Sequence, residues 1–501
     1  MADNKKDIEI EPFPVYAPTL GIIGNIPPTM LDPRAFTNCN NIRLKDGVAS
    51  KRTGYVAYGT GTITGIPILL FSYQQFNLTE YEILVTTTNV YYRNSGGAWV
   101  SLVDSLGGVD SMTASLAFIQ NYMVFTNGVD NPAKCLGVTW SALDDGKTIG
   151  WDDYLPKIFV PYKERLLGFN DNNSGTAIRV IYSVLGDFDN VNDAGAGFND
   201  FTRGMGNEIV GAAELKDYVA VYKNMSCCLL DYIGGSSLYS LSAHVQGIGL
   251  LAPHAIANLG TSHIFLGSDW NIHEWNGGWE LNHIGDPIKK LLQSELTAAS
   301  KAKAKRNFCI VNLEQREVTF FIVIGANTYP TRTWTYNLDD RSWVKGTIAS
   351  ISAGGSVTKD GVERSLLGLA TTVGETTTGT THHYDYSALN DGAAAIDCNF
   401  ETGDFILSKE GYQRRQRKYG GVDLDVKGYS TSAKLTLEYS SDEGVAWSTA
   451  EEKTLTAVYA WTNWHFLATA RKLRFRFSDA TLGQSFAIRY YGLNQKEGEI
   501  A

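Results

Sequence analysis

Short apolar runs separated by tight polar turns return along most of the chain. The clearest example spans His263 to Trp279, where residues 264–266 and 271–275 are expected to be strands joined by a turn at Ser268 and Asp269. Asn-Gly-Gly at 276–278 then turns toward a third strand, because such residues supply the positive φ angles of tight hairpins. Each unit is too small to bury its own apolar face, so several units must stack. Looser copies run over Tyr81–Trp99, Tyr122–Trp140 and Thr319–Trp343.

The repeat length predicts an all-β fold built on a β-propeller. Units return roughly every 40 to 50 residues, the length of a four-stranded blade, which gives about seven blades. Only one helix is expected, from Asp286 to about Lys303, with Asp286 as its cap and Pro287 at its first position. The other strands predicted from the pattern are Tyr55–Tyr58, Ile83–Thr87, Tyr122–Thr126, Ile178–Ser183, Tyr218–Tyr222, Cys227–Tyr232, Thr319–Ile324 and Thr333–Asn337.

Changes in composition divide the chain into three expected parts. Residues 1–36 are rich in proline and predict an extended N-terminal arm, which wraps either its own domain or a neighbour. Residues 37–392 are the expected propeller, with a Thr- and Gly-rich surface stretch from Gly354 to Gly379. Residues 393–501 are expected to form a β-sandwich, since Leu473, Phe475 and Phe477 alternate with cations as in a half-buried strand.

Charge and cysteine content limit the classes of function. The net charge is −10 with a pI of about 5.4, which does not suit a general polyanion-binding protein. The six cysteines are scattered in a pattern typical of neither a metal site nor a disulfide framework, and Cys227 and Cys228 should point to opposite faces of a strand. No apolar run is long enough for a signal peptide or a membrane span, so we expect synthesis and folding in the cytoplasm.

Three stretches, in their order along the chain, resemble one family. They are Asn40–Tyr55, with the pattern N-x-R-x-x-D-G-x-x-x-K-R-x-G-Y; Tyr162–Phe188, with its R-L and Y-S pairs; and Glu208–Gly267. This order is similar to that of the tail hub or nozzle proteins of short-tailed bacteriophages, also called tail tube B or DNA-stabilisation proteins. The resemblance implies a propeller core and a ring, usually of six copies, placed below the head-tail connector with a channel for the genome.

The basic residues within these stretches also have simpler interpretations. Arg43, Lys51 and Arg52 flank a predicted hairpin turn at Lys45 to Gly47, where solvation and turn geometry are their expected roles. Arg165 lies between strand residues and is expected to form an ion pair within the propeller rather than a contact with DNA.

Several groups of residues match patterns that carry chemistry in other proteins. Ser440, Asp442, Gly444 and Trp447 match the Asp-box pattern S-x-D-x-G-x-x-W, which predicts a structural turn. His263, His273 and His283 are ten residues apart and are expected to neighbour one another across a blade without holding a metal. Glycoside hydrolysis needs two carboxylates facing one cleft, and the spacing selects no pair among Asp187, Asp189, Asp231 and Asp385. We therefore expect no enzymatic activity, no metal and no cofactor.

Two basic clusters interrupt the acidic average. Residues 301–306 follow the predicted helix, where cations suit the C-terminal end of a helix dipole. Arg414, Arg415, Arg417 and Lys418 open the predicted sandwich. Their charge either protects an edge strand against pairing, docks an acidic partner subunit, or contacts DNA, and the sequence leaves these three alternatives open.

These observations predict a structural virion protein of a phage tail. It would form a ring, expected to be a hexamer, between the head-tail connector or adaptor and the distal tail proteins, and retain and then pass double-stranded DNA during ejection. An acidic lumen would repel the phosphates and keep friction low, whereas a basic lumen wall would contradict this hypothesis. The alternatives are a glycan-binding adhesin or receptor-binding component, using aromatic residues such as Trp270, Trp275 and Trp279, and a glycosidase.

Overall fold

The computed structural model describes residues 15–107, 114–144, 146–235, 237–373, 376–406, 417–430 and 432–495. The protein is almost entirely β-sheet and divides into two compact units. The first unit comprises Met1–Gly54, Asp340–Lys345 and Leu389–Ala501, and the second comprises Tyr55–Asp339 and Gly346–Ala388. This division differs from the expected boundaries at 37 and 392, because strands from both ends of the chain pair with each other.

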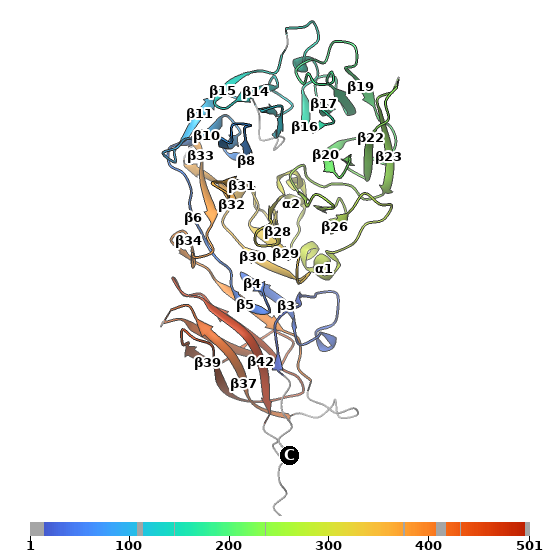
Figure 1. The fold of residues 1–501 in the computed structure, drawn as a ribbon. Coiled ribbons are helices and arrows are strands. Elements are labelled where there is room, and N and C mark those ends of the chain that lie inside the picture. The colour runs from blue at the N-terminus through green and yellow to red at the C-terminus, as the bar shows by residue number, and fades with distance from the viewer. Residues whose placement is uncertain are drawn as a thin grey trace, which may run out of the picture. The chain divides into compact units, whose positions relative to one another are not determined.

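The second unit is a β-propeller of seven sheets, which Figure 1 shows following one another around a ring. Each of the first four blades has four strands. The first blade is β8–β11 (Pro67–Gln74, Glu80–Thr86, Val90–Arg93, Trp99–Val103), and the second is β12–β15 (Ser115–Ile119, Tyr122–Thr126, Ala133–Leu136, Thr139–Ala142). The third blade is β16–β19 (Pro156–Tyr162, Arg165–Asp171, Thr176–Tyr182, Gly197–Asp200), and the fourth is β20–β23 (Ile209–Leu215, Tyr218–Lys223, Ser226–Tyr232, Tyr239–Gln246). The fifth blade is β24–β26 (Ile256–Asn258, His263–Leu266, Ile272–Trp275), and the sixth contains β27–β29 (Phe308–Asn312, Glu317–Ile322, Arg332–Asn337). β30 (Trp343–Thr347) follows β29 and spans the boundary between the units.

The seventh blade closes the ring with a strand from the other end of the propeller sequence. It contains β31 (Ile351–Lys359), β32 (Val362–Val373) and β33 (Thr376–Tyr384), and β33 pairs with β6 (Tyr55–Ala57) and with β7 (Ile63–Thr64). β6 precedes the first blade in sequence, so its pairing ties the start of the propeller to its last blade. Closure of this kind satisfies a strand edge that would otherwise remain open.

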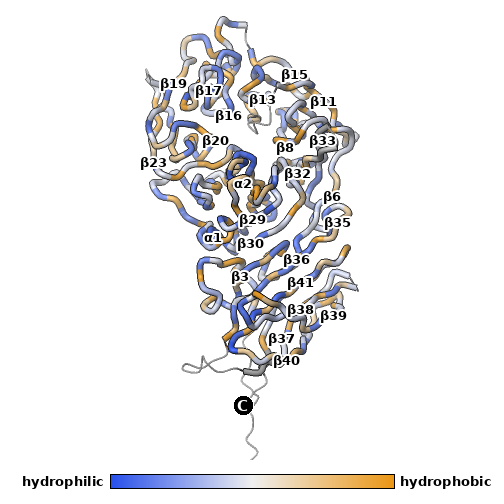
Figure 2. The backbone as a smooth tube through the Cα atoms, turned by 180° about the vertical axis from the view of Figure 1, so that it is seen from behind, coloured by the Kyte–Doolittle hydropathy of each residue, from blue (hydrophilic) through white to orange (hydrophobic). Residues whose placement is uncertain are grey.

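Apolar side chains fill the spaces between neighbouring blades. Leu167 and Phe169 of the third blade share a fully buried cluster with Val219 and Val221 of the fourth. Figure 2 shows hydrophobic and hydrophilic stretches alternating over short distances along the chain, as expected where each strand has a buried and a wetter side. The prediction that the units must stack to bury their apolar faces is therefore confirmed.

The cysteines have the structural role that their spacing indicates. All six are free thiols. Cys228 belongs to the cluster between the third and fourth blades, whereas Cys227 belongs to a different cluster that contains Tyr222 and Trp275. The two adjacent thiols thus point to opposite faces of β22, as predicted.

The stretch from Gly354 to Gly379, expected to be a surface stretch, lies mostly in strands in its described residues, although residues 360–362 at its first turn are exposed. It supplies parts of the three long strands of the seventh blade. A Cβ atom at Gly355 would lie 2.1 Å from the carbonyl oxygen of Leu70 in β8, so the glycine permits the backbones of the seventh and first blades to approach. Gly355 thus serves the close packing of two strands.

The predicted helix is interrupted. α1 (Asp286–Ser294) has Gly285 as its N-cap, with Asp286 inside the first turn rather than at the cap. Thr297 caps a second helix, α2 (Ala298–Ala302), by accepting a hydrogen bond from the Ser300 backbone nitrogen. A Thr cap favours a new helix start over continuation of the first helix, which explains the break. Two further short 3-10 turns are η2 (Trp151–Asp153) and η3 (Ala304–Arg306).

The first unit is built on two sheets, with strands from both ends of the chain in each. One sheet has the order β4-β5-β42-β37-β40, with β1 on β42; the other includes the order β2-β3-β36-β41-β38-β39. The strands are β1 (Val15–Tyr16), β2 (Gly21–Ile22), β3 (Ala35–Asn40), β4 (Ile42–Lys45), β5 (Val48–Lys51), β36 (Cys398–Thr402), β37 (Arg417–Gly428), β38 (Lys434–Ser440), β39 (Ser448–Thr454), β40 (Ala460–Ala470), β41 (Arg474–Asp479) and β42 (Phe486–Gln495), with the short pair β34 (Asn390–Asp391) and β35 (Ala394–Ala395) and the turn η1 (Pro28–Met30).

The N-terminal arm, where it is described, stays with its own unit. Val15 and Tyr16 pair with Gly492 and Tyr491 of β42, and the Tyr491 hydroxyl donates a hydrogen bond to the Pro33 carbonyl. Leu473, Phe475 and Phe477 of the C-terminal unit are buried as predicted, but Arg474 between them is also buried, at 7% exposure, in an ion pair with Asp404, so the opposite face of this strand is not entirely wet. Sheet pairing rather than proline content therefore decides the course of the arm.

The basic residues near the first hairpin do more than the sequence suggests. Asp46 and Gly47 both have positive φ and form the predicted tight turn between β4 and β5. Lys51, however, is fully buried and lies 2.9 Å from the Asp479 carboxylate, and Arg52 forms two bonds with Asp391. The prediction that solvation is their main role is therefore wrong: both are partners in ion pairs of the first unit.

Arg165 also differs from its prediction. Its side chain is buried, and its Nη1 donates to the backbone carbonyls of Ser183 and Gly195. Carbonyl oxygens replace the expected carboxylate, because the strand and turn around Arg165 present backbone acceptors at this point.

Candidate functional site

Residues from successive blades of the propeller line one cavity of about 190 Å³. The first strands of neighbouring blades contact one another, β12 with β16 and β16 with β20, so they form the inner wall of the ring. Ser115 begins β12, Lys157 is the second residue of β16, and Glu208 immediately precedes β20. The cavity therefore lies where these inner strands begin, and we call it the mouth of the propeller.

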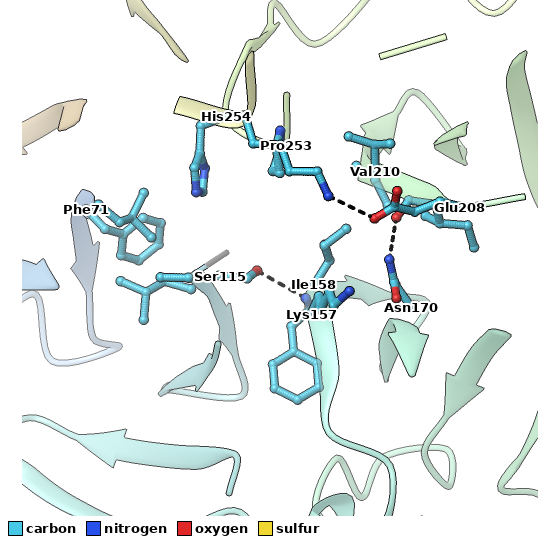
Figure 3. Close-up of a pocket in the computed structure, with 17 residues that line it drawn as sticks. Phe71, Ser115, Lys157, Ile158, Asn170, Glu208, Val210, Pro253 and His254 are labelled. Carbon is cyan, nitrogen blue, oxygen red and sulfur yellow. Dashed lines mark hydrogen bonds and ion pairs between the residues drawn. The ribbon is translucent and has the colours of Figure 1, made fainter. Parts of the chain in front are cut away.

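Polar and apolar side chains both line the mouth, and Figure 3 shows Val210 beside Glu208. Figure 3 shows Asn170 and Glu208 on one side of the cavity and Phe71 on the opposite side. Ile158 and Val210 add further apolar surface. The mouth combines apolar surface with a few fixed polar groups, as small-molecule sites do, in a volume smaller than most of them have.

Hydrogen bonds hold most of the polar groups in place. The Asn170 side-chain amide donates to the carbonyl of Ile209 at 2.9 Å, and the backbone nitrogen of Phe159 donates to the Ser115 hydroxyl at 3.1 Å. Lys305 Nζ lies 3.2 Å from a carboxylate oxygen of Glu208. These contacts come from different blades, so the ring closure itself orients the side chains.

Lys157 has no such partner among the described residues. Burial lowers the pKa of its ammonium group, and the positive charge of Lys305 lowers it further, while Glu208 acts in the opposite direction. Two ammonium groups and one carboxylate thus lie close enough at the mouth to influence one another electrostatically. A partly buried charge with a perturbed pKa in a cavity is a recognised sign of a functional site.

Sequence reasoning missed most of this site. Lys305 belongs to the basic cluster at 301–306, which was assigned to the helix end, and Glu208 appeared only within a stretch that carries the family resemblance. Ser115, Lys157 and Asn170 stand at strand ends, where polar residues are common, so no local signal distinguishes them. Only ring closure brings them to one place.

The three spaced histidines are divided between two environments. His273 and His283 meet through their Nδ1 atoms at 2.9 Å, and His273 also contacts the Asp269 carboxylate at 2.9 Å. His263 instead bonds the Tyr222 hydroxyl and the Glu214 carbonyl, and burial lowers its pKa to about 4. Over the described ranges, no group of three or more potential ligand side chains is arranged to hold a metal ion.

Two of the candidate carboxylates, Asp187 and Asp189, lie in one connection between β18 and β19, whereas Asp231 and Asp385 lie elsewhere in the propeller. Asp189 forms an ion pair with Lys134, and Asp385 accepts hydrogen bonds from Ser387, which lower the pKa of its carboxyl group. Asp231 lies on β22 of the fourth blade, and Asp187 lies in the turn that follows β18 of the third. Asp189 and Asp385 thus each have a partner within the propeller.

The Asp-box residues form the local turn that was predicted. The Ser440 hydroxyl bonds the Asp442 carboxylate at 2.7 Å, and the same carboxylate accepts a bond from the backbone nitrogen of Ala446 at 2.9 Å. Gly444 has a φ of +89°, and the guanidinium of Arg476 lies 4.3 Å from the centre of the Trp447 ring. These contacts are all turn geometry and packing.

The aromatic residues considered for glycan binding differ in exposure. Trp275 is buried in the propeller and donates to the Gly278 carbonyl, so it cannot serve as the exposed glycan-binding aromatic residue proposed from the sequence. Trp279 is 70% exposed and stacks on His244 with 4.2 Å between ring centres and 4° between planes. A surface hollow lined by Lys216, Tyr218 and His244, among others, lies beside it.

The predicted docking residues are only partly described. Arg414 and Arg415 lie outside the described residues, whereas Arg417 and Lys418 begin β37 and pair with Ala470 and Thr469 of β40. From Tyr419 onward β37 is flanked by both β42 and β40, so most of this strand is internal to its sheet. Arg417 and Lys418 precede the part paired with β42, so edge protection, subunit docking and DNA contact all stay open for this basic cluster.

None of the helices in the described ranges has the length and apolar character needed to cross a membrane. No protein-family model matches the chain, and no curated protein is significantly similar to it in sequence.

Several solved structures are similar in fold. Virginiamycin B lyase from Staphylococcus aureus is 8% identical over 66% of this chain and 98% of that one, with a TM-score of 0.41. YCF48 bound to D1 peptide is 10% identical over 68% of this chain and 97% of that one, with a TM-score of 0.38. PorZ, a surface component of the type-IX secretion system of Porphyromonas gingivalis, is 10% identical over 82% of this chain, with a TM-score of 0.34, and the chain covers 46% of PorZ. These likenesses assign no role to the chain, and its own sheets make it an all-β protein with a β-propeller.

Proposed function

We propose that this chain is a non-enzymatic structural protein of a phage tail, a hub or nozzle that assembles into a ring around the path of the genome. The order of motifs from Asn40 to Gly267 supports the family assignment. The mouth of the propeller is far too small for a DNA duplex, because its 190 Å³ is below the usual range of even small-molecule pockets. In this proposal the DNA path is therefore the lumen of the assembled ring, between copies of the chain.

The observation that carries ring formation is an exposed apolar face on the first unit. Val422, Leu424 and Val426 of β37 point into the core, so the opposite side of the sheet faces outward. On the neighbouring strand β40, Trp461 and Leu467 are 58% and 74% exposed. Tyr490 of β42 is also exposed, and its ring lies nearly parallel to that of Trp461. The Trp461–Tyr490 pair, with Leu467 six residues further along β40, is exposed apolar surface of the kind that marks protein–protein interfaces.

Mass photometry of the purified full-length chain tests this proposal, alone and with its connector. Six copies of the 55.0 kDa chain would give a particle of about 330 kDa. The double variant Trp461→Ser, Leu467→Ser should shift the population toward smaller species, because it removes the apolar contact. Val445→Ser is the matched control, since Val445 is 85% exposed but lies in the Asp-box turn. A monomer with and without the connector would contradict ring formation.

The electrostatic part of the proposal needs its own measurement. A low-friction lumen should bind duplex DNA weakly and with little dependence on salt, because few phosphates are neutralised. Fluorescence anisotropy of labelled duplex with assembled rings measures both properties. Tight binding with a steep salt dependence would contradict an acidic lumen.

Reversing Arg417 and Lys418 to glutamate tests whether this basic pair docks a neighbouring subunit or a connector.

Glycan binding is a second candidate because of one observation, the exposed stack of Trp279 on His244 beside a surface hollow. An exposed indole face can pack against the C–H groups of a sugar ring. Saturable binding of host polysaccharide that is lost in Trp279→Ala, by a chain that stays monomeric, would favour this function over the ring.

A further inference from the structure

The mouth of the propeller carries an excess of one positive charge. Among the residues that line it, Lys157 and Lys305 are the lysines, and Glu208 is the only carboxylate. Glu208 is bonded to Lys305, which leaves Lys157 without an ion-pair partner in the described part of the chain. A monoanion would neutralise this excess, whereas a dianion such as a phosphate monoester would add a second charge beside Glu208.

The apolar side chains of the mouth favour a monoanion that carries a hydrocarbon group. Phe71, Ile158 and Val210 present hydrocarbon surface to the cavity (Figure 3), which an inorganic anion would leave unfilled. A cavity of about 150 Å³ is known to hold one benzene molecule, so the 190 Å³ here has room for a ring and a carboxylate group. The Ser115 hydroxyl accepts the Phe159 backbone N–H and keeps its own proton available to donate.

From this arrangement we propose that the mouth of the propeller binds a carboxylate carried on a small apolar body, with the carboxylate at Lys157 and the body against Phe71, Ile158 and Val210. This site is independent of ring formation and of the DNA path. A free small molecule and the C-terminal residue of a docked peptide share this chemistry.

Proton linkage supports the assignment. The groups near Lys157 that carry or exchange charge are Glu208, Lys305 and His254. Burial and the charge of Lys305 lower the pKa of Lys157 in the free protein, and a bound carboxylate would raise it again. Binding should therefore take up protons at alkaline pH, in the interval between the free and bound pKa values.

Isothermal titration of the full chain with benzoate tests the proposal, with benzamide as the neutral analogue of the same shape. We expect benzoate to bind and benzamide to bind at least roughly tenfold more weakly, since a charge-assisted hydrogen bond is lost. Titrations in two buffers of different ionisation enthalpy, at several alkaline pH values, measure the proton uptake. Equal affinity for the two ligands, or no binding of benzoate, would overturn the proposal.

Two variants with opposite expected effects guard against misfolding. Lys157→Met should weaken benzoate binding by roughly tenfold or more and abolish the proton uptake. Glu208→Gln should strengthen binding, because it removes the competing carboxylate and releases Lys305. Lys301→Met is the control, since Lys301 is an exposed lysine that does not line the mouth. Failure of Glu208→Gln to strengthen binding, in a variant that unfolds like the parent, would contradict the charge argument.

N-acetylphenylalanine distinguishes the two sources of the carboxylate, because it presents the same group at a peptide terminus. Binding as tight as that of benzoate would identify a docked chain end as the occupant. Binding of benzoate alone would identify a free small molecule. Lack of binding by both compounds would refute the site.

Discussion

The buried pair of Lys51 and Asp479 offers the sharpest test of how the first unit is held together. Lys51 ends β5 in one sheet and Asp479 ends β41 in the other, so their bond connects the two sheets. Their side chains are 0% and 2% exposed, and Lys51 Nζ also donates to the Thr481 carbonyl at 3.1 Å. The perturbation is Lys51→Met, which keeps the length of the side chain and removes its charge.

The expected loss follows from the burial of the partner. Lys51→Met leaves the Asp479 carboxylate in the core with the Thr481 backbone N–H as its remaining hydrogen-bond donor. Removing one partner of a buried ion pair typically destabilises by about 3 to 5 kcal/mol, and the retained bond places our expectation near about 3 kcal/mol. Replacing both members by apolar residues removes the orphaned charge, so Lys51→Met, Asp479→Leu should recover most of the loss.

Hydrogen exchange followed by mass spectrometry is the suitable assay, because two units need not unfold in one step. Peptides from β5 and β41 should lose protection in Lys51→Met, whereas peptides from the propeller strands β12 and β16 should not change. Restored protection in the double variant is the second expected result. The reasoning would be refuted if the opening free energy of the β5 and β41 peptides in Lys51→Met stayed within about 0.5 kcal/mol of the parent value. It would also be refuted if the double variant were less protected there than the single one.

Two further predictions concern the propeller. In the folded protein the pKa of His263 is about 4, against an ordinary value of 6.5. Between these two pH values the unfolded chain therefore binds more protons than the folded one. The free energy of unfolding should fall by about 3 kcal/mol as the pH decreases from 6.5 to 4. His263→Gln should remove this dependence in urea unfolding at several pH values, and unchanged pH slopes would contradict it. Gly355→Ala should destabilise by about 1 to 3 kcal/mol, because its Cβ would press on the Leu70 carbonyl. Gly96→Ala, where a Cβ meets only a side-chain atom at 3.4 Å, should be nearly neutral in the same thermal unfolding assay.

Local features of the fold were predictable because they depend on near neighbours in the sequence. The Asn-Gly-Gly turn after Trp275, the Asp46-Gly47 hairpin and the Asp box all follow from turn chemistry within a few residues. The structure differs from the expectation where local chemistry is ambiguous. Thr and Gly between Gly354 and Gly379 are typical of loops, yet the same small residues permit two blade backbones to approach closely.

The candidate site was much less predictable than the fold. Ser115, Lys157 and Glu208 are separated by dozens of residues, and each stands at the start of a strand, where a polar residue is unremarkable. Their meeting depends on the curvature of the ring, which no local pattern encodes. The burial of Lys51 was missed for the same reason, since its partner Asp479 is 428 residues away.

The sequence by itself determined the strand and turn pattern, the number of blades to within one, and the burial of Leu473, Phe475 and Phe477. These properties follow from hydrophobic period and turn residues, which act over a few positions. The tertiary structure alone decided that β1 to β5 join the C-terminal strands, that β6 completes the seventh blade, and that Lys157 and Glu208 share one cavity. Such pairings are chosen by the burial of whole faces against distant segments, because many strands have similar local patterns and only the complete ring satisfies all their edges.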